Sequence, residues 1–173
     1  MLEIALLVVL LVWLLVCMFY DLRFRQLPMN LTLIPLVVAG IYALFHGGWV
    51  LVGLTVSLIV FSDLEPRERR LLFAAVFSAF AAIFDPTKVA LVAALALIWL
   101  LWEVGVMGGA DAKLLMVITL VIQHPMIFLF IALAGGVQGL TALLLRKKEI
   151  PYIVAIFAGS TMYALNSLVL KIF

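Results

Sequence analysis

The sequence predicts an all-α protein, a polytopic transmembrane bundle of about 6–8 helices. Hydrophobic residues make up 68% of the 173 residues and charged residues only 12%, whereas soluble domains average roughly 45–50% and about 25%. The mean hydropathy is +1.37, and long apolar runs recur along the chain, separated by short polar or basic stretches. Because no linker or low-complexity tract divides these runs, we expect a single membrane domain over residues 1–173.

The first apolar run, residues 2–20, has about the 20 residues that a helix needs to span a bilayer. We interpret it as a membrane helix and not as a signal peptide, because Glu3 precedes it and no small-residue cleavage site follows. Pro28 interrupts or begins the next helix, which Asn30 is suited to cap. The His-Gly-Gly sequence at 46–48 predicts the turn after it.

The most charged stretch, residues 63–70, follows a third apolar run. We expect it to be a solvated loop, in which Asp63, Glu65 and Glu68 lie among three arginines. Its two flanking helices are short for full membrane spans.

Two further turns are predicted later in the chain. Residues 85–87 and 123–125 each contain a proline and predict turns. In the helix after the second turn, Gly135, Gly136 and Gly139 are predicted close-packing positions. The predicted helices cover about 2–20, 30–45, 49–62, 71–84, 88–104, 110–122, 126–145 and 152–170.

Eight alternating spans agree with the tendency of basic residues to stay on the cytoplasmic side. If Asp21 is cytoplasmic, Lys88 and Lys171 lie outside, as do both termini, while Asp111 shares the face of Asp21. The predicted cytoplasmic basic residues are Arg23, Arg25, Arg67, Arg69, Arg70, Lys113, Arg146, Lys147 and Lys148.

Two aspartates are the candidate functional residues. Residues 108–113 read Gly-Gly-Ala-Asp-Ala-Lys, and an ionisable residue at membrane depth is a functional-site hypothesis by default. The glycines allow a sharp turn and close packing. Asp21 is a second carboxylate of this kind, at the foot of the first apolar run.

Two close carboxyls can share one proton and supply both the base and the acid of peptide hydrolysis. We therefore predict that Asp21 and Asp111 form one aspartic protease site. The structural alternative is that Asp21 pairs with Arg23 or Arg25, and Asp111 with Lys113.

The remaining polar residues give no second site. Glu103 is expected at the membrane interface, with the cavity leading to Asp111 as the alternative. His46 and His124 fall in outside turns without metal-ligand spacing, so no metal and no cofactor is expected. The single cysteine, Cys17, is expected to pack in an apolar run.

The small net charge of +2 gives no reason to expect a nucleic-acid partner. Serines and tryptophans in the apolar runs are assigned to packing or lipid contact. Ser57, Ser78 and Ser160 lie in apolar runs and are predicted helix-packing residues. Trp13, Trp49, Trp99 and Trp102 are predicted interface or lipid-facing residues.

At these motifs the sequence resembles the type IV prepilin peptidases and archaeal preflagellin peptidases, membrane aspartyl proteases with a Gly-x-Gly-Asp-type motif. Asp21 is followed by basic residues and by Pro-Met-Asn at 28–30. Residues 108–113 match the second motif, although Ala110 stands where many members have glycine. Residues 150–152 and Gly159 resemble the family's proline-containing C-terminal helix start.

The resemblance implies that Asp21 and Asp111 are catalytic and that Gly108, Gly109 and Lys113 support them. It implies removal of a short basic leader from pilin-like or archaellin-like precursors at the cytoplasmic membrane face. Bifunctional members carry a segment with paired cysteines, which is absent here, so no methyltransferase activity is expected.

Three other interpretations stay open. Presenilin-like proteases carry a Tyr-Asp pair, which Tyr20 and Asp21 fit, but their Pro-Ala-Leu motif is absent. A small transporter or channel would use the aspartates as a proton or cation relay. A non-catalytic assembly factor would tolerate Asn at either aspartate. The substrate-binding residues and the oligomeric state stay open as well.

Overall fold

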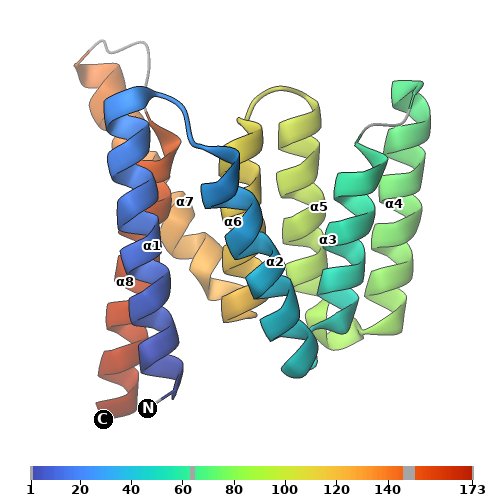
Figure 1. Ribbon diagram of the computed structural model, residues 1–173, viewed down its shortest axis with the longest axis horizontal. Helices are drawn as coiled ribbons and strands as arrows, with labels where there is room; N and C mark the ends of the chain where they lie inside the picture. The colour runs from blue at the N-terminus through green and yellow to red at the C-terminus, as the bar shows by residue number, and fades with distance from the viewer. Residues whose placement is uncertain (1, 63–64, 146–150, 173) are drawn as a thin grey trace. The chain divides into compact units, whose positions relative to one another are not determined.

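The computed structural model describes residues 2–62, 65–145 and 151–172, and within these ranges every regular element is a helix (Figure 1). The predicted all-α class is therefore confirmed. Asp63 and the predicted basic loop with Arg146, Lys147 and Lys148 lie outside the described residues. The elements are α1 Leu2–Phe24, α2 Met29–Phe45, α3 Trp49–Phe61, α4 Arg67–Phe84, the 3₁₀ turn η1 Pro86–Lys88, α5 Val89–Glu103, α6 Gly109–Ile122, α7 Met126–Leu144 and α8 Tyr152–Ile172.

Four stretches of the described helices are long and apolar enough to cross a membrane, which agrees with a multi-pass membrane protein. The other apolar helices, α2 and α3, are shorter, and α4 carries four charged residues in its first turn. The alternation of eight full spans stays a prediction. The four long stretches are Ile4–Phe24, Pro86–Glu103, Met126–Leu144 and Tyr152–Val169.

Two helices extend further into charged sequence than predicted. α1 continues past residue 20 to Phe24, so Asp21 lies in its last turn. α4 begins at Arg67, so the expected loop is wrong for Glu68, which is helical, while Glu65 precedes the helix and is exposed. A carboxylate in the first turn stabilises a helix through the helix dipole, which favours this earlier start.

The chain forms two compact units, and each is described by itself. The first combines Met1–Leu31 with Met126–Phe173, and the second is Thr32–Pro125. The single-domain organisation over residues 1–173 stays a prediction.

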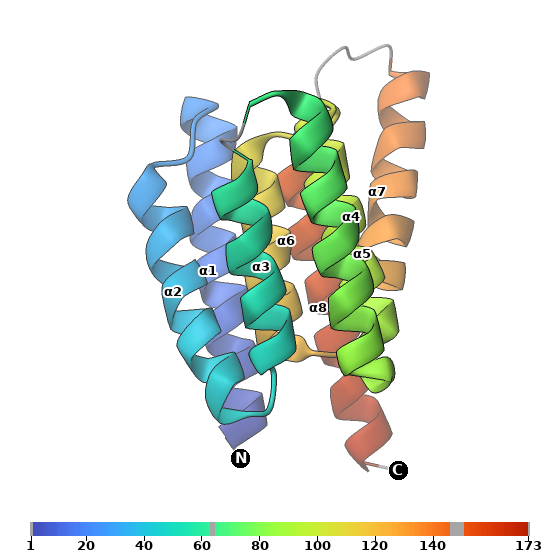
Figure 2. The same ribbon diagram turned by 90° about the vertical axis from the view of Figure 1, so that its right-hand side faces the viewer.

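In the first unit, α8 packs against both α7 and α1. The side chains of Leu14, Cys17, Ile153 and Ile156 are fully buried there, so the predicted packing role of Cys17 is confirmed. α1 and α8 run antiparallel, with the first residue of α1 and the last residue of α8 at the same end (Figures 1 and 2). Asp21 therefore lies at the end of this unit where α8 begins.

α7 and α8 approach each other closely at Gly159. A Cβ atom on Gly159 would lie 2.6 Å from the Ile131 backbone nitrogen, and closer still to its Cα, so any side chain there collides with backbone. Gly135 also faces α8, since its Cβ would lie 3.7 Å from the Ala155 Cβ. The prediction of close packing is wrong for Gly136 and Gly139, which have nothing within 4 Å of such a Cβ.

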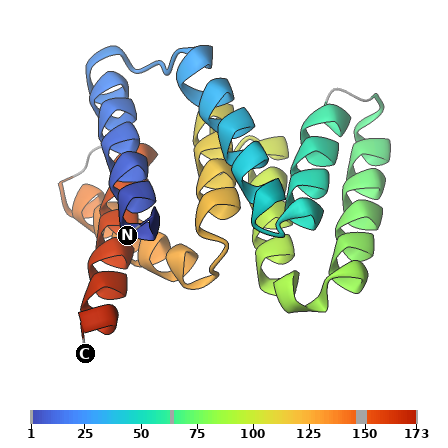
Figure 3. The same ribbon diagram turned by 60° about the horizontal axis from the view of Figure 1, so that its bottom comes forward.

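In the second unit, α5 is surrounded by α3, α4 and α6, and α3 and α4 lie side by side (Figures 2 and 3). The predicted interface position is wrong for Trp99, whose side chain is only 2% exposed. The physical reason is that α5 has helices around it where a lipid-facing residue would need an open face. Trp49, at the start of α3, is exposed and lies edge-on to Phe84.

Lys88 marks one end of the second unit. Its ammonium donates to the Gly47 carbonyl and, at 3.2 Å, to Oε1 of Gln123, and it lies 3.9 Å from Asp85. The turn after α2, the turn before α5 and the end of α6 therefore meet. Arg70 in α4 and Asp111 in α6 lie at the opposite end of this unit, and the alternation of the spans across a membrane stays a prediction.

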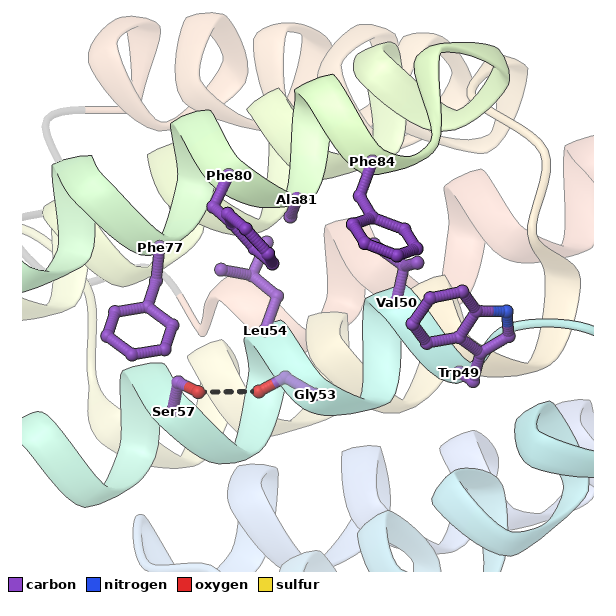
Figure 4. A pocket seen from close by; sticks show the side chains of 9 residues that line it. All are labelled: Trp49, Val50, Gly53, Leu54, Ser57, Phe77, Phe80, Ala81 and Phe84. Carbon is purple, nitrogen blue, oxygen red and sulfur yellow. Dashed lines mark hydrogen bonds between the residues drawn. The ribbon is translucent and has the colours of Figure 1, made fainter.

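An apolar pocket opens between α3 and α4 towards the Lys88 end (Figure 4). The Ser57 hydroxyl donates to the Gly53 carbonyl at 2.8 Å, so it is satisfied within its own helix, in agreement with a packing role. The lining residues of the pocket are Trp49, Val50, Gly53, Leu54, Ser57, Phe77, Phe80, Ala81 and Phe84.

Candidate active site

Asp111 lies in the first turn of α6, where the helix dipole favours a carboxylate. Gly108 is the N-cap in an extended conformation, with φ −66° and ψ 144°, and its carbonyl accepts the first helical hydrogen bond from the Ala112 amide. A Cβ on Gly108 would lie 3.4 Å from Oδ2 of Asp111. The half-buried carboxylate of Asp111 therefore folds back towards the helix start.

The sharp turn between α5 and α6 is made by Gly105 and not by the two glycines that the sequence analysis singled out. Gly105 has φ +80°, a conformation that glycine adopts without strain. Its amide donates to the Trp102 carbonyl at 3.0 Å, and the Val106 amide donates to the Leu101 carbonyl at 3.0 Å. This pair of bonds is a Schellman motif. A glycine shortly after a predicted helix end was the signal that could have identified it.

Gly109 is needed for packing against Trp102. A Cβ on Gly109 would lie 2.9 Å from Nε1 of the indole and 3.3 Å from its Cε2. The Lys113 ammonium lies 6.0 Å from the centroid of the same ring, at the limit of a cation–π contact. Trp102 was predicted to face the interface or lipid; it is half-buried against the motif instead.

Glu103 forms an ion cluster with two arginines at the end of α5, and its expected place at the membrane interface stays a prediction. Its side chain is 8% exposed; Oε1 lies 3.1 Å from Nη1 of Arg70 and 3.7 Å from Nε of Arg67. The same Arg70 nitrogen donates to the Ser62 carbonyl at 2.9 Å. The cluster joins the end of α3, the start of α4 and the end of α5, next to the turn that leads to Asp111.

Asp21 is a half-buried residue in the last turn of α1. The Arg25 amide donates to the Asp21 carbonyl at 2.9 Å, and Arg25 itself has φ 54°, which ends the helix. Asp21 belongs to the first unit and Asp111 to the second. Of the predicted site residues, the second unit gathers Gly108, Gly109 and Lys113 around Asp111, and the pairing of Asp111 with Asp21 stays a prediction.

The histidines take no part in this arrangement. His46 stacks on Tyr42, and its Nδ1 lies 2.9 Å from the Tyr42 carbonyl; His124 follows α6 at the Lys88 end. Among the residues that the structure describes, no group of three His, Cys, Asp or Glu side chains is placed to hold a metal ion.

A comparison with protein families matches part of the chain. Residues 68–144 match the model of the type IV leader peptidase family. The predicted resemblance to leader peptidases is thereby confirmed, and a protease function is supported. The matched segment includes Arg70, Glu103 and the whole of 108–113, and it begins after Asp21. No curated protein and no solved structure matched the chain.

Proposed function

We propose that the chain is an aspartic endopeptidase that removes the short basic leader from pilin-like or archaellin-like precursors. The observation that carries the proposal is the position of Asp111. It is a half-buried carboxylate in the first turn of α6, shortly after Gly108 and Gly109, within the segment that matches the leader peptidase family.

Asp21 is the proposed second carboxyl. Hydrolysis of a peptide bond needs a base to activate water and an acid to protonate the leaving amine. Two close aspartates meet both needs by sharing one proton and titrate as a pair. Asp21 lies at a helix end in the first unit, as Asp111 does in the second, and membrane-surface cleavage needs carboxylates at such positions. The proposal requires neither a metal nor another cofactor.

The proposed place of cleavage is the cytoplasmic face of the cell membrane. Arg67 and Arg70 lie at the Asp111 end of the second unit and Lys88 at the other, which the positive-inside tendency assigns to the cytoplasmic and outer sides. A precursor with a basic leader before an apolar helix presents its cleavage site at this surface.

The test is cleavage of a purified pilin-type precursor by wild type, Asp21→Asn and Asp111→Asn in proteoliposomes. An amide can neither act as the base nor hold the shared proton, so each variant should lose about 10²–10⁴-fold in rate. Asp85→Asn is the matched control, because Asp85 is a carboxylate at the Lys88 end of the second unit; it should cleave at the wild-type rate.

The outcomes separate the competing classes of function. If either Asn variant cleaves at the full rate, the aspartate pair is wrong. If wild type leaves every precursor intact but conducts protons in the same vesicles, and both Asn variants abolish this flux, the relay function replaces the proposal. If pilus assembly in cells survives both substitutions, a non-catalytic assembly role is favoured.

A further inference from the structure

Trp102 contacts the proposed catalytic motif on both sides of Asp111. The edge of its indole lies against Gly109, where a Cβ would come within 2.9 Å of Nε1. The Lys113 ammonium lies 6.0 Å from the ring centroid. Gly109 and Lys113 stand two residues before and two residues after Asp111, so one side chain of α5 spans the first turn of α6.

The geometry of a helix explains why Trp102 does not cover Asp111 itself. Residues four apart, such as 109 and 113, lie on one face of a helix. A residue two positions from each is turned by about 200° from the first, because each residue adds about 100°. The indole therefore supports the face of α6 opposite to Asp111 and does not cover the carboxylate.

The position of Trp102 is fixed by hydrogen bonds and an ion pair at the end of α5. Its carbonyl accepts the Gly105 amide in the Schellman motif. The next residue, Glu103, is bound by Arg70, which also bonds to the end of α3. Because α5 ends in this network, the indole has a defined position against which the start of α6 can be placed.

We propose that Trp102 is a positioning residue, which sets the place of the Asp111 carboxylate by packing against Gly109 and beneath Lys113. This inference rests on the proposed peptidase function. Trp102 does not touch the reacting atoms in this arrangement, so its loss affects the rate through the placement of Asp111. A misplacement of about 1 Å is enough to cost roughly 10²-fold in catalysis.

The first experiment is a size exchange between the two contacting residues. Gly109→Ala introduces a methyl group against the indole, and Trp102→Leu removes the indole; each should lower kcat by at least about 10-fold with KM within about 2-fold of wild type. In the double variant the smaller side chain makes room for the methyl group. The kcat of the double variant should therefore be higher than the value expected if the fold-losses of the two single variants were multiplied.

Trp99→Phe is the matched control. Trp99 lies one turn earlier on the same helix and is equally a tryptophan, but it is buried in the core. Its substitution should lower the unfolding temperature while the folded enzyme keeps its kcat. Trp102→Phe, which retains an aromatic face for Lys113, should keep more activity than Trp102→Leu.

The second experiment needs no cleavage. Hydrogen exchange at the amides of Ala112 and Lys113, the first with helical partners in α6, should become at least about 10-fold faster in Trp102→Leu and stay unchanged in Trp99→Phe. Equal exchange in both variants would overturn the inference, as would a kcat of Trp102→Leu that follows only the folded fraction. If wild type cleaves no precursor, the peptidase function fails, and the exchange rates still decide whether Trp102 fixes this turn.

Discussion

Arg70 and Glu103, 33 residues apart in the chain, are joined by an ion pair in which Nη1 lies 3.1 Å from Oε1. The carboxylate is nearly buried, at 8% exposure, whereas the arginine side chain is 24% exposed. The same Arg70 nitrogen also bonds to the Ser62 carbonyl. The pair therefore connects the end of α3, the start of α4 and the end of α5, at the end of the unit that carries Asp111.

Glu103→Gln should therefore destabilise the protein. Removing one partner of a buried pair costs about 3–5 kcal/mol, and partial exposure of Arg70 places the expected loss at or below the lower figure. Thermal unfolding in detergent measures it. Arg69→Gln, an exposed change on the same turn of α4, is the control and should leave the transition in place. A Glu103→Gln transition that matches this control would mean that the pair contributes nothing.

Gly159→Leu should disrupt the packing of α8 on α7. Its side chain would enter space that the Ile131 backbone occupies, and overpacking of this kind costs about 1–3 kcal/mol or more. Gly136→Ala on α7 is the counterpart, because a Cβ there meets nothing within 4 Å and alanine favours a helix by about 1 kcal/mol. We expect opposite shifts in unfolding temperature, and shifts of the same sign would contradict the observed helix approach.

Lys88→Met should loosen the end of the second unit that is remote from Asp111. The ammonium bonds to the Gly47 carbonyl and to Gln123, and hydrogen bonds to a charged group contribute about 1.5–3 kcal/mol. The unfolding temperature should fall, while kcat per folded molecule stays at the wild-type value. A lower kcat per folded molecule without a lower unfolding temperature would show that this end of the unit affects the reaction.

Cysteine labelling tests the predicted topology. Cys17 is buried, so a Cys17→Ala background removes the native thiol before Glu65→Cys or His124→Cys is added at an exposed position. In intact cells a membrane-impermeant maleimide should label His124→Cys, whereas Glu65→Cys should react only after permeabilisation. Labelling of both from one side would refute the alternation of α4 to α6.

Much of the fold could be predicted because prolines, glycines and apolar runs are local signals. Residues 49–62 and 110–122 were predicted as helices and nearly coincide with α3 and α6. The end of α1 and the start of α4 were misplaced by four residues each. The reason is that hydropathy falls at the first charged residue, whereas backbone hydrogen bonding continues through a charged turn whose long side chains reach water.

The site was predicted less completely than the fold. The sequence singled out Asp111 and its glycines because a carboxylate and paired glycines are rare in apolar sequence. It gave no sign that Trp102 packs on Gly109 or that Glu103 pairs with Arg70, because neither partner follows from local spacing. The Schellman turn at Gly105 was within reach, since a glycine just past a helix end is a local signal.

The contact between α1 and α8 has a consequence for the order of biosynthesis. α1 leaves the ribosome before the other helices of the described chain, and its partner α8 comes after all of them. Until α8 has been made, α1 lacks this packing partner, and contacts between such distant segments form late. Asp21 is carried on α1, so a nascent chain cannot fix this aspartate in place, and unfinished copies of the protein are expected to be inactive.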